Sequence, residues 1–218
     1  MLHGTSVLSA VLAPVLPVPS ILPVLLSVLE QQPNAVLVAP PGAGKTTLTP
    51  LALLDVPWLA GQKIILVEPR RVAVRGAASR MASTLGERPG ETVGFRTRTD
   101  SAVSSRTRIE VVTEGLLVRR LLADPTLDGV GAVLFDEVHE RSLDLDAALA
   151  FCLDLQRELR PDLRILAMSA TPDGRVFITL MNAPLIESEG RQYPIDVRHT
   201  RDLSHPRDLP EACARAIR

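Results

Sequence analysis

APPGAGKTT, residues 39–47, follows the apolar run AVLVA (35–39) and precedes a stretch with helical periodicity. A glycine-rich loop between a strand and a helix is typical of phosphate binding, because its backbone N–H groups surround an anion at the positive end of the helix. The stretch matches the pattern G-x-x-x-x-G-K-[ST], except that Ala39 replaces the first glycine. An ordinary glycine-rich turn with a solvated lysine is the alternative, but the flanking elements favour a phosphate loop. The predicted nucleotide-binding residues are Ala39, Pro40, Pro41, Gly42, Ala43, Gly44, Lys45, Thr46 and Thr47.

Short apolar runs alternate with helical stretches along most of the chain. Such runs, when helices separate them, predict a parallel sheet that is covered by helices on both faces. The expected fold class is therefore α/β. The expected strands are 35–39, 63–68, 92–98, 108–113, 132–136, 164–170 and 184–188. The expected helices are a short one capped by Ser20, with Pro23 in its first turn, and then 45–54, 70–86, 114–123, 142–159 and 176–182.

VLFDEVHERS, residues 133–142, places two acids and a histidine at the end of an apolar run. A zinc site of the HExxH type is excluded because position 143 is Leu143. A glycosidase pair is disfavoured because neighbouring strand residues point to opposite faces. Together with the phosphate loop, Asp136 is expected to hold Mg²⁺ with Thr46, and Glu137 is expected to orient the attacking water. The residues alone leave the role of His139 open.

Composition sets limits on the partners and the compartment. The chain has 218 residues and a net charge of −1, so any nucleic-acid site must be a local one. Two widely spaced cysteines give no sign of a disulfide framework, and a cytoplasmic protein is the default expectation. The uncharged stretch 4–29 carries four prolines, which disfavours a membrane-spanning helix.

A change of composition near Gly190 predicts a domain boundary. Residues 191–218 are polar and rich in proline, and they are too few for a second domain. We expect an N-terminal extension over 1–15, one domain over 16–190, and a linker with the truncated start of a second domain over 191–218.

Five motifs occur in the order and approximate spacing of DEAH-box superfamily-2 helicases, which the chain therefore resembles. They are PPGAGKT (40–46), EPRRVAV (68–74), VTEGLL (112–117), DEVHER (136–141) and SAT (169–171). Val138 replaces the alanine of DEAH, at the side chain that is least tied to the chemistry. The resemblance covers residues 16–190 and implies a RecA-like domain that binds ATP and Mg²⁺.

The resemblance also implies roles that spacing does not reveal. Lys45, Asp136, Glu137 and His139 would form the catalytic set. Nucleic-acid contacts would come from Arg70, Arg71, Thr113, Glu114 and Gly115, and coupling between the two sites from Ser169 and Thr171. The alternatives are a charged helix start at 70–71, a helix cap at Thr113 and a strand-ending turn at 169–171. Arg96 and Arg98 would add basic surface or lie on an exposed strand face.

The function that the resemblance implies is ATP-dependent unwinding of RNA, with DNA left open. A second RecA-like domain in the same polypeptide would supply arginine fingers, so the present chain alone is expected to be weakly active or inactive. A P-loop phosphotransferase and a non-catalytic, nucleotide-gated binding module are the alternatives.

Overall fold

The computed structural model of the chain describes residues 17–188 and 206–216, and the strands of this part form one sheet. The strand order is β4-β3-β5-β2-β6-β7-β1-β8, and all neighbours are parallel except β3 and β4. The mainly parallel α/β sheet is as predicted. The strands are β1 (Asn34–Val38), β2 (Lys63–Glu68), β3 (Val93–Arg96), β4 (Ser101–Ala102), β5 (Ile109–Thr113), β6 (Val130–Phe135), β7 (Arg164–Ser169) and β8 (Leu185–Glu187).

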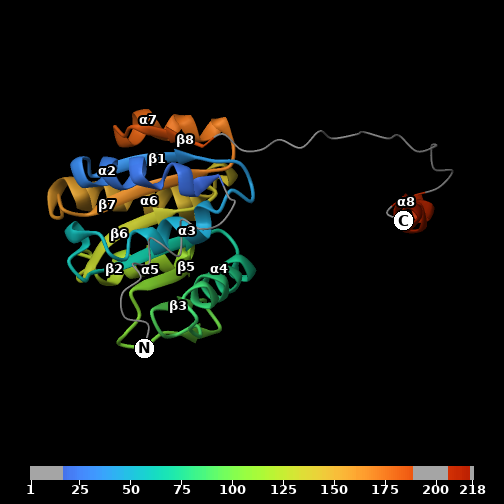
Figure 1. Cartoon of the computed structure of the whole chain (residues 1–218), viewed down its shortest axis with the longest axis horizontal. Coiled ribbons are helices and arrows are strands. Elements are labelled where there is room, and N and C mark those ends of the chain that lie inside the picture. The colour runs from blue at the N-terminus through green and yellow to red at the C-terminus, as the bar shows by residue number, and fades with distance from the viewer. Residues whose placement is uncertain (1–16, 189–205, 217–218) are drawn as a thin grey trace.

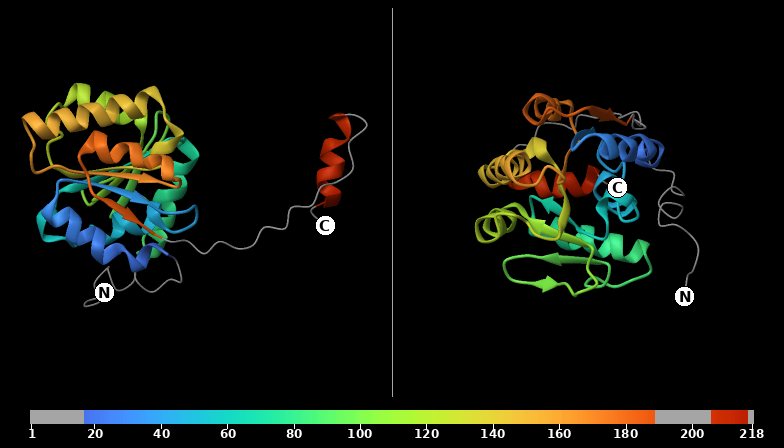
Figure 2. Two further views of the ribbon diagram at one scale, coloured as in Figure 1. Left: turned by 90° about the horizontal axis from the view of Figure 1, so that it is seen from above. Right: turned by 90° about the vertical axis from the view of Figure 1, so that its left-hand side faces the viewer.

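Helices cover both faces of the sheet, which confirms the prediction (Figures 1 and 2). One layer contains α2, α3 and α4, and the other contains α5, α6 and α7. The helices are α2 (Leu22–Gln31), α3 (Lys45–Ala52), α4 (Arg71–Thr84), α5 (Glu114–Ala123), α6 (Leu143–Glu158), α7 (Val176–Met181) and α8 (Leu209–Ala216). Short 3₁₀ helices are η1 (Val18–Ser20), η2 (Pro57–Leu59), η3 (Val138–Glu140), η4 (Pro172–Arg175) and η5 (Pro206–Asp208).

β6 shows why the strands are apolar along their whole length. Each of its six residues is buried. Leu134 packs in the core under α2, α3 and α4, while Val133 and Phe135 pack in the core under α5, α6 and α7. A strand with helices on both faces needs apolar side chains in both directions.

The carboxyl ends of the parallel strands meet at one end of the sheet, where ligands bind in open α/β folds. β7 lies between β1 and β6, and Val38 and Phe135 are level with Ser169 and Ala167. The loops that follow these three strands are therefore neighbours. This register brings the glycine-rich loop toward the acids after β6.

Two local expectations differ from the structure. Ser20 does not cap the first helix, because Ile21 is the N-cap residue and the Ser20 hydroxyl donates to the Pro17 carbonyl. Pro23 does lie in the first turn of α2, where proline is tolerated. The antiparallel strand β4 was not expected, since two residues carry no detectable periodicity.

The predicted N-terminal extension over 1–15 lies outside the described residues, and so does most of the predicted linker over 191–218. After position 205, the described residues form the 3₁₀ helix η5 and then the helix α8. None of the helices in these ranges is both long and apolar enough to span a membrane.

Gly94 of β3 provides a test of the packing at the β3–β4 edge. A Cβ at Gly94 would clash with the Ala102 carbonyl and would lie 2.9 Å from a methyl group of Val103. We expect Gly94→Ala to destabilise the chain by about 1–3 kcal/mol, as overpacking does. Urea unfolding followed by circular dichroism measures this change.

Gly76 of α4 is the matched control, because a Cβ there would meet nothing within 4 Å. Gly76→Ala should stabilise the chain by about 0.5–1 kcal/mol through helix propensity. Equal effects of the two substitutions would contradict this account of the β3–β4 edge.

Candidate functional site

The glycine-rich loop joins β1 to α3 at the carboxyl end of the sheet. Gly42 and Gly44 have φ values of 73° and 94°, in the left-handed region that side chains with a Cβ rarely adopt. Gly44 is the N-cap residue of α3, and no side chain caps this helix end. The first N–H groups of α3 are therefore not occupied by a capping side chain, as an anion site requires.

Lys45 and Thr46 reach from this loop to the acid pair that follows β6. The Lys45 ammonium group is buried, and its Nζ lies 2.9 Å from Glu137 Oε1. The Thr46 hydroxyl donates a hydrogen bond to Asp136 Oδ2. The structure thus brings together the four residues that the sequence predicts at the centre of the site.

Thr46 and Asp136 fit the predicted magnesium site. Mg²⁺ prefers hard oxygen ligands and is usually held by one or two protein groups, its remaining positions being taken by water and phosphate. A hydroxyl and a carboxylate in direct contact supply such a pair. Burial raises the pKa of Asp136, whereas the Thr46 hydrogen bond and the charge of Lys45 act in the opposite direction.

Glu137 occupies a strained backbone position. Its φ is 51°, which is uncommon for a residue with a Cβ, and its N–H donates to Asp136 Oδ1 over 2.9 Å. This conformation ends the strand geometry immediately after Asp136. As a result, both carboxylates reach the loop, although neighbouring residues of a regular strand point to opposite faces.

His139 links the acid pair to the end of β7. Its Nδ1 accepts from the Ala170 N–H over 3.4 Å and lies 3.2 Å from the buried Ser169 hydroxyl. The same atom lies 3.4 Å from Glu137 Oε2, a contact that becomes an ion pair when the imidazole is protonated. Ser169 in turn donates to the Thr171 carbonyl over 2.9 Å. The DEVH and SAT motifs are therefore in direct contact.

Glu68 is a member of this site that the sequence analysis missed. It ends β2, is buried, and lines a hollow of about 400 Å³ with Thr46, Asp136 and Glu137. Among the described residues, no group forms a hydrogen bond with its Oε1. Burial, followed by the charges of Asp136 and Glu137, raises the pKa of the Glu68 carboxyl to about 9. An acid at the end of the apolar run KIILVE was a usable signal, because Asp136 ends a neighbouring strand of the same sheet.

Arg70 and Arg71 begin α4 next to this hollow. Arg70 is the N-cap residue of α4 and Arg71 its first residue, and both are exposed. The Arg70 guanidinium pairs with Glu140 across 2.8 Å. Arg70 is therefore in contact with the segment that carries the acid pair.

Thr113 ends β5 level with Glu68, and Glu114 and Gly115 are the first residues of α5. Thr113 is the N-cap residue of α5, but its side chain makes no capping bond. The Glu114 carboxylate is buried and accepts from the Ser142 hydroxyl over 2.5 Å. Burial raises the pKa of Glu114, which the Ser142 hydrogen bond opposes. The Glu114 side chain therefore links the turn 113–115 to Ser142, the N-cap residue of α6.

Ser142 and Asp144 connect this turn to the start of α6, which follows the acid pair in the chain. The Ser142 hydroxyl accepts from the Leu145 N–H over 2.9 Å, which confirms the predicted cap of α6. A Cβ at Gly115 would lie 2.8 Å from Asp144 Oδ2, so the turn packs closely on the start of α6. The sequence analysis did not predict this contact between two separate motifs.

The loop after β1, the acids after β6 and the order of the sheet together define a RecA-like P-loop domain. The chain belongs to the DEAD/DEAH box helicase family, whose family model matches residues 21–178. The resemblance seen in the five motifs is thereby confirmed. Family membership does not favour the phosphotransferase or the non-catalytic module.

Similar proteins agree with this assignment. The chain is 51% identical over 193 residues to the ATP-dependent RNA helicase HrpB of Escherichia coli (strain K12), a match that covers 88% of this chain and 24% of that protein. One crystal structure of Escherichia coli HrpB matches 83% of this chain with a TM-score of 0.79 and 52% identity. Another matches 100% of it with a TM-score of 0.80 and 46% identity. These matches cover 23% and 26% of the two crystallised chains, so this chain spans about a quarter of such relatives.

The pKa of Glu68 leads to a prediction about stability and pH. A carboxyl with a folded-state pKa of about 9 and an ordinary value of 4.5 contributes stability below pH 4.5 that is lost as the pH rises toward 9. Glu68→Gln should therefore be more stable than the parent chain at pH 8, and the difference should shrink toward pH 5. Urea unfolding at both pH values measures it.

Glu30, on the exposed side of α2, is the control residue. Glu30→Gln should change stability little at either pH. If the stability of Glu68→Gln changed between the two pH values as much as that of the parent chain, the neutral state of Glu68 would be refuted.

Proposed function

We propose that this chain is the N-terminal motor domain of an ATP-dependent RNA helicase, extending over about residues 16–190. It binds Mg–ATP at the loop 39–47 and a nucleic-acid backbone at the turns that follow β2 and β5. One observation supports this most directly: Lys45 and Thr46 contact both acids of the DEVH motif. A second RecA-like domain later in the same polypeptide completes the motor, which works in the cytoplasm.

Nucleotide binding starts with an exchange of partners at Lys45. In this structure the ammonium group of Lys45 pairs with Glu137. The phosphates of ATP carry more negative charge, so Lys45 transfers to their oxygens and releases the Glu137 carboxylate. Glu137 is then free to accept a hydrogen bond from the attacking water and to orient it.

Asp136 and Thr46 would hold the magnesium ion that accompanies ATP. The bound ion neutralises charge on the phosphates, and hydrolysis of the γ-phosphate depends mainly on positioning and charge neutralisation. Thr46 would keep its hydrogen bond to Asp136, because a hydroxyl that donates its hydrogen still has lone pairs to offer the ion. The backbone N–H of Glu137 keeps Asp136 in place through its other oxygen.

The nucleic-acid contacts lie at the same end of the sheet as the nucleotide. Arg70 and Arg71 present guanidinium groups to phosphates, and the turn 113–115 presents its backbone. Contacts of this kind give affinity without sequence selectivity. RNA is the proposed polymer because the relatives are named RNA helicases.

One set of contacts extends from each of these sites. His139, Ser169 and Thr171 connect the water-orienting acid to the end of β7. Glu114 and Ser142 connect the turn 113–115 to the start of α6. A phosphotransferase would use neither the SAT segment nor the exposed arginines of α4.

Glu137→Gln in the full-length protein tests the role of the acid pair. We expect nucleotide binding to be retained and hydrolysis to fall by about 10²-fold or more, because the variant cannot accept the proton of the water. Phosphate release and fluorescent-nucleotide binding measure the two effects. Lys45→Ala is the contrasting variant and should lose nucleotide affinity itself. Unchanged turnover in Glu137→Gln would refute a hydrolytic role.

The 218-residue chain alone should bind nucleotide but hydrolyse it slowly, and it should not separate duplexes. The proposed second domain supplies arginine fingers, which are worth about 10³–10⁵ in rate. Comparing RNA-stimulated hydrolysis by this chain and by the full-length protein measures the difference. Strong RNA-stimulated hydrolysis by the chain alone would contradict the proposal.

A further inference from the structure

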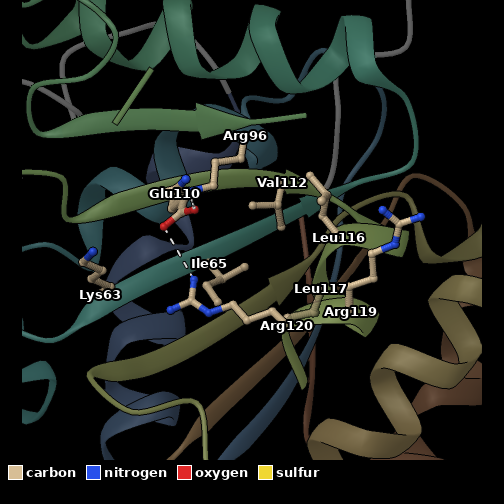
Figure 3. Close-up of a pocket in the computed structure, with 9 residues that line it drawn as sticks. All are labelled: Lys63, Ile65, Arg96, Glu110, Val112, Leu116, Leu117, Arg119 and Arg120. Atoms are coloured by element: carbon tan, nitrogen blue, oxygen red, sulfur yellow. Dashed lines mark hydrogen bonds and ion pairs between the residues drawn. The ribbon is translucent and has the colours of Figure 1, made fainter. Parts of the chain in front are cut away.

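A basic hollow of about 420 Å³ opens on the sheet face that carries α5, away from the nucleotide loop (Figure 3). Basic side chains enter it from three elements: Lys63 from β2, Arg96 from β3, and Arg119 and Arg120 from α5. The single acid among its lining residues is Glu110 of β5. The lining therefore carries a net charge of +3 (4 − 1), although the whole chain has −1.

Glu110 fixes two of these cations in place. It is almost completely buried, and its carboxylate lies 2.6 Å from Arg96 Nε and 3.5 Å from Arg120 Nη1 (Figure 3). A guanidinium group has five N–H donors, so these contacts leave further donors on both arginines directed at the hollow. A buried acid that holds two arginines in this way prepares their positions for an anion.

Lys63 and Arg119 are the cations without an ion-pair partner among the described residues that line this hollow. Figure 3 shows them at opposite ends, with Glu110, Arg96 and Arg120 between them. The positive charge therefore extends along the strand direction. A linear anion fits this arrangement better than a compact one.

The basic hollow adjoins the predicted nucleic-acid contacts. A second hollow of about 270 Å³ is lined by Arg98, Thr113 and Gly115, and the two hollows share Leu116 and Arg119 as lining residues. Lys63 lies five residues before Glu68, which is level with Thr113. At about 3.3 Å per residue, the far end is about 16 Å from the turn, which is enough for a few nucleotides.

We propose that the basic hollow continues the nucleic-acid path, so that single-stranded backbone leaving Thr113 and Gly115 runs beside α5 to Lys63. This inference rests on the proposed function, because it extends the same binding site. Lys63 and Arg119 contact phosphates directly. Arg96 and Arg120, held by Glu110, present their remaining N–H groups to the backbone.

An acidic peptide is the other polymer that this charge could attract. The floor of the hollow is aliphatic, with Ile65, Val112 and Leu117, and suits a leucine side chain as well as a base or sugar. Continuity with the turn 113–115 decides in favour of nucleic acid, since a strand bound there reaches the hollow without another anchor.

The test uses the full-length protein and a ladder of fluorescein-labelled oligouridines of increasing length. The affinity of the parent protein should rise first at the length at which a strand binds the turn 113–115. It should rise a second time once the strand is long enough to reach Lys63. Lys63→Gln should abolish this second rise and leave the shortest bound oligouridine unaffected. Arg119→Gln should weaken short and long strands alike, because Arg119 lines both hollows. For long strands, the slope of log affinity against log salt should fall by about 0.7 for each phosphate that a variant no longer neutralises.

Three controls separate the outcomes. Arg88→Gln removes an exposed arginine that lines neither hollow and should change nothing. Lys63→Arg keeps the charge and should restore the second rise. Nucleotide affinity should be equal in the parent and in Lys63→Gln, which verifies the fold.

Three results would contradict these proposals. Parent protein that binds no oligouridine of any length would overturn the proposed function together with this inference. Binding in which Lys63→Gln follows the parent at every length would overturn the inference alone. The inference is also overturned if polyglutamate binds in a Lys63-dependent manner while the oligouridine ladder is unaffected.

Discussion

The burial of Lys45 is the constraint on which the rest of the site depends. An ammonium group taken out of water is stable only beside an opposite charge, and the Glu137 carboxylate 2.9 Å away supplies it. This pairing requires the loop after β1 and the acids after β6 to meet across β7. The positive φ of Glu137 follows from the same requirement, because a regular strand would turn Glu137 away from Asp136.

The electrostatics of the site follow from an excess of acids around one buried cation. Glu68, Asp136 and Glu137 end or follow neighbouring strands, and the Lys45 ammonium group pairs with Glu137. Burial and mutual repulsion hold the pKa of Glu68 far above that of a solvated carboxyl. The site is therefore suited to additional positive charge.

The turn after β5 and the start of α4 both contact the segment that follows β6. Glu114 holds the Ser142 hydroxyl, and Gly115 lies against Asp144, so the turn after β5 rests on the start of α6. Arg70 pairs with Glu140 of η3 in the same segment. Both sets of contacts therefore reach residues that follow the acid pair in the chain. The basic hollow lies on the sheet face beside α5, and it shares Leu116 and Arg119 with the hollow at the turn after β5.

By itself, the sequence determined the fold class, the phosphate loop and the expectation that Thr46, Asp136 and Glu137 lie together in one site, because periodicity and local motifs encode them directly. Roles for Arg70 and Thr113 came from resemblance, since a charged helix start or a helix cap would look the same in sequence. Only the tertiary structure revealed Glu68 as a third acid, the support of Glu114 by Ser142, and the basic hollow around Glu110. The reason is physical: strand order and register decide which strand ends become neighbours, and these pairings form between segments far apart in the chain.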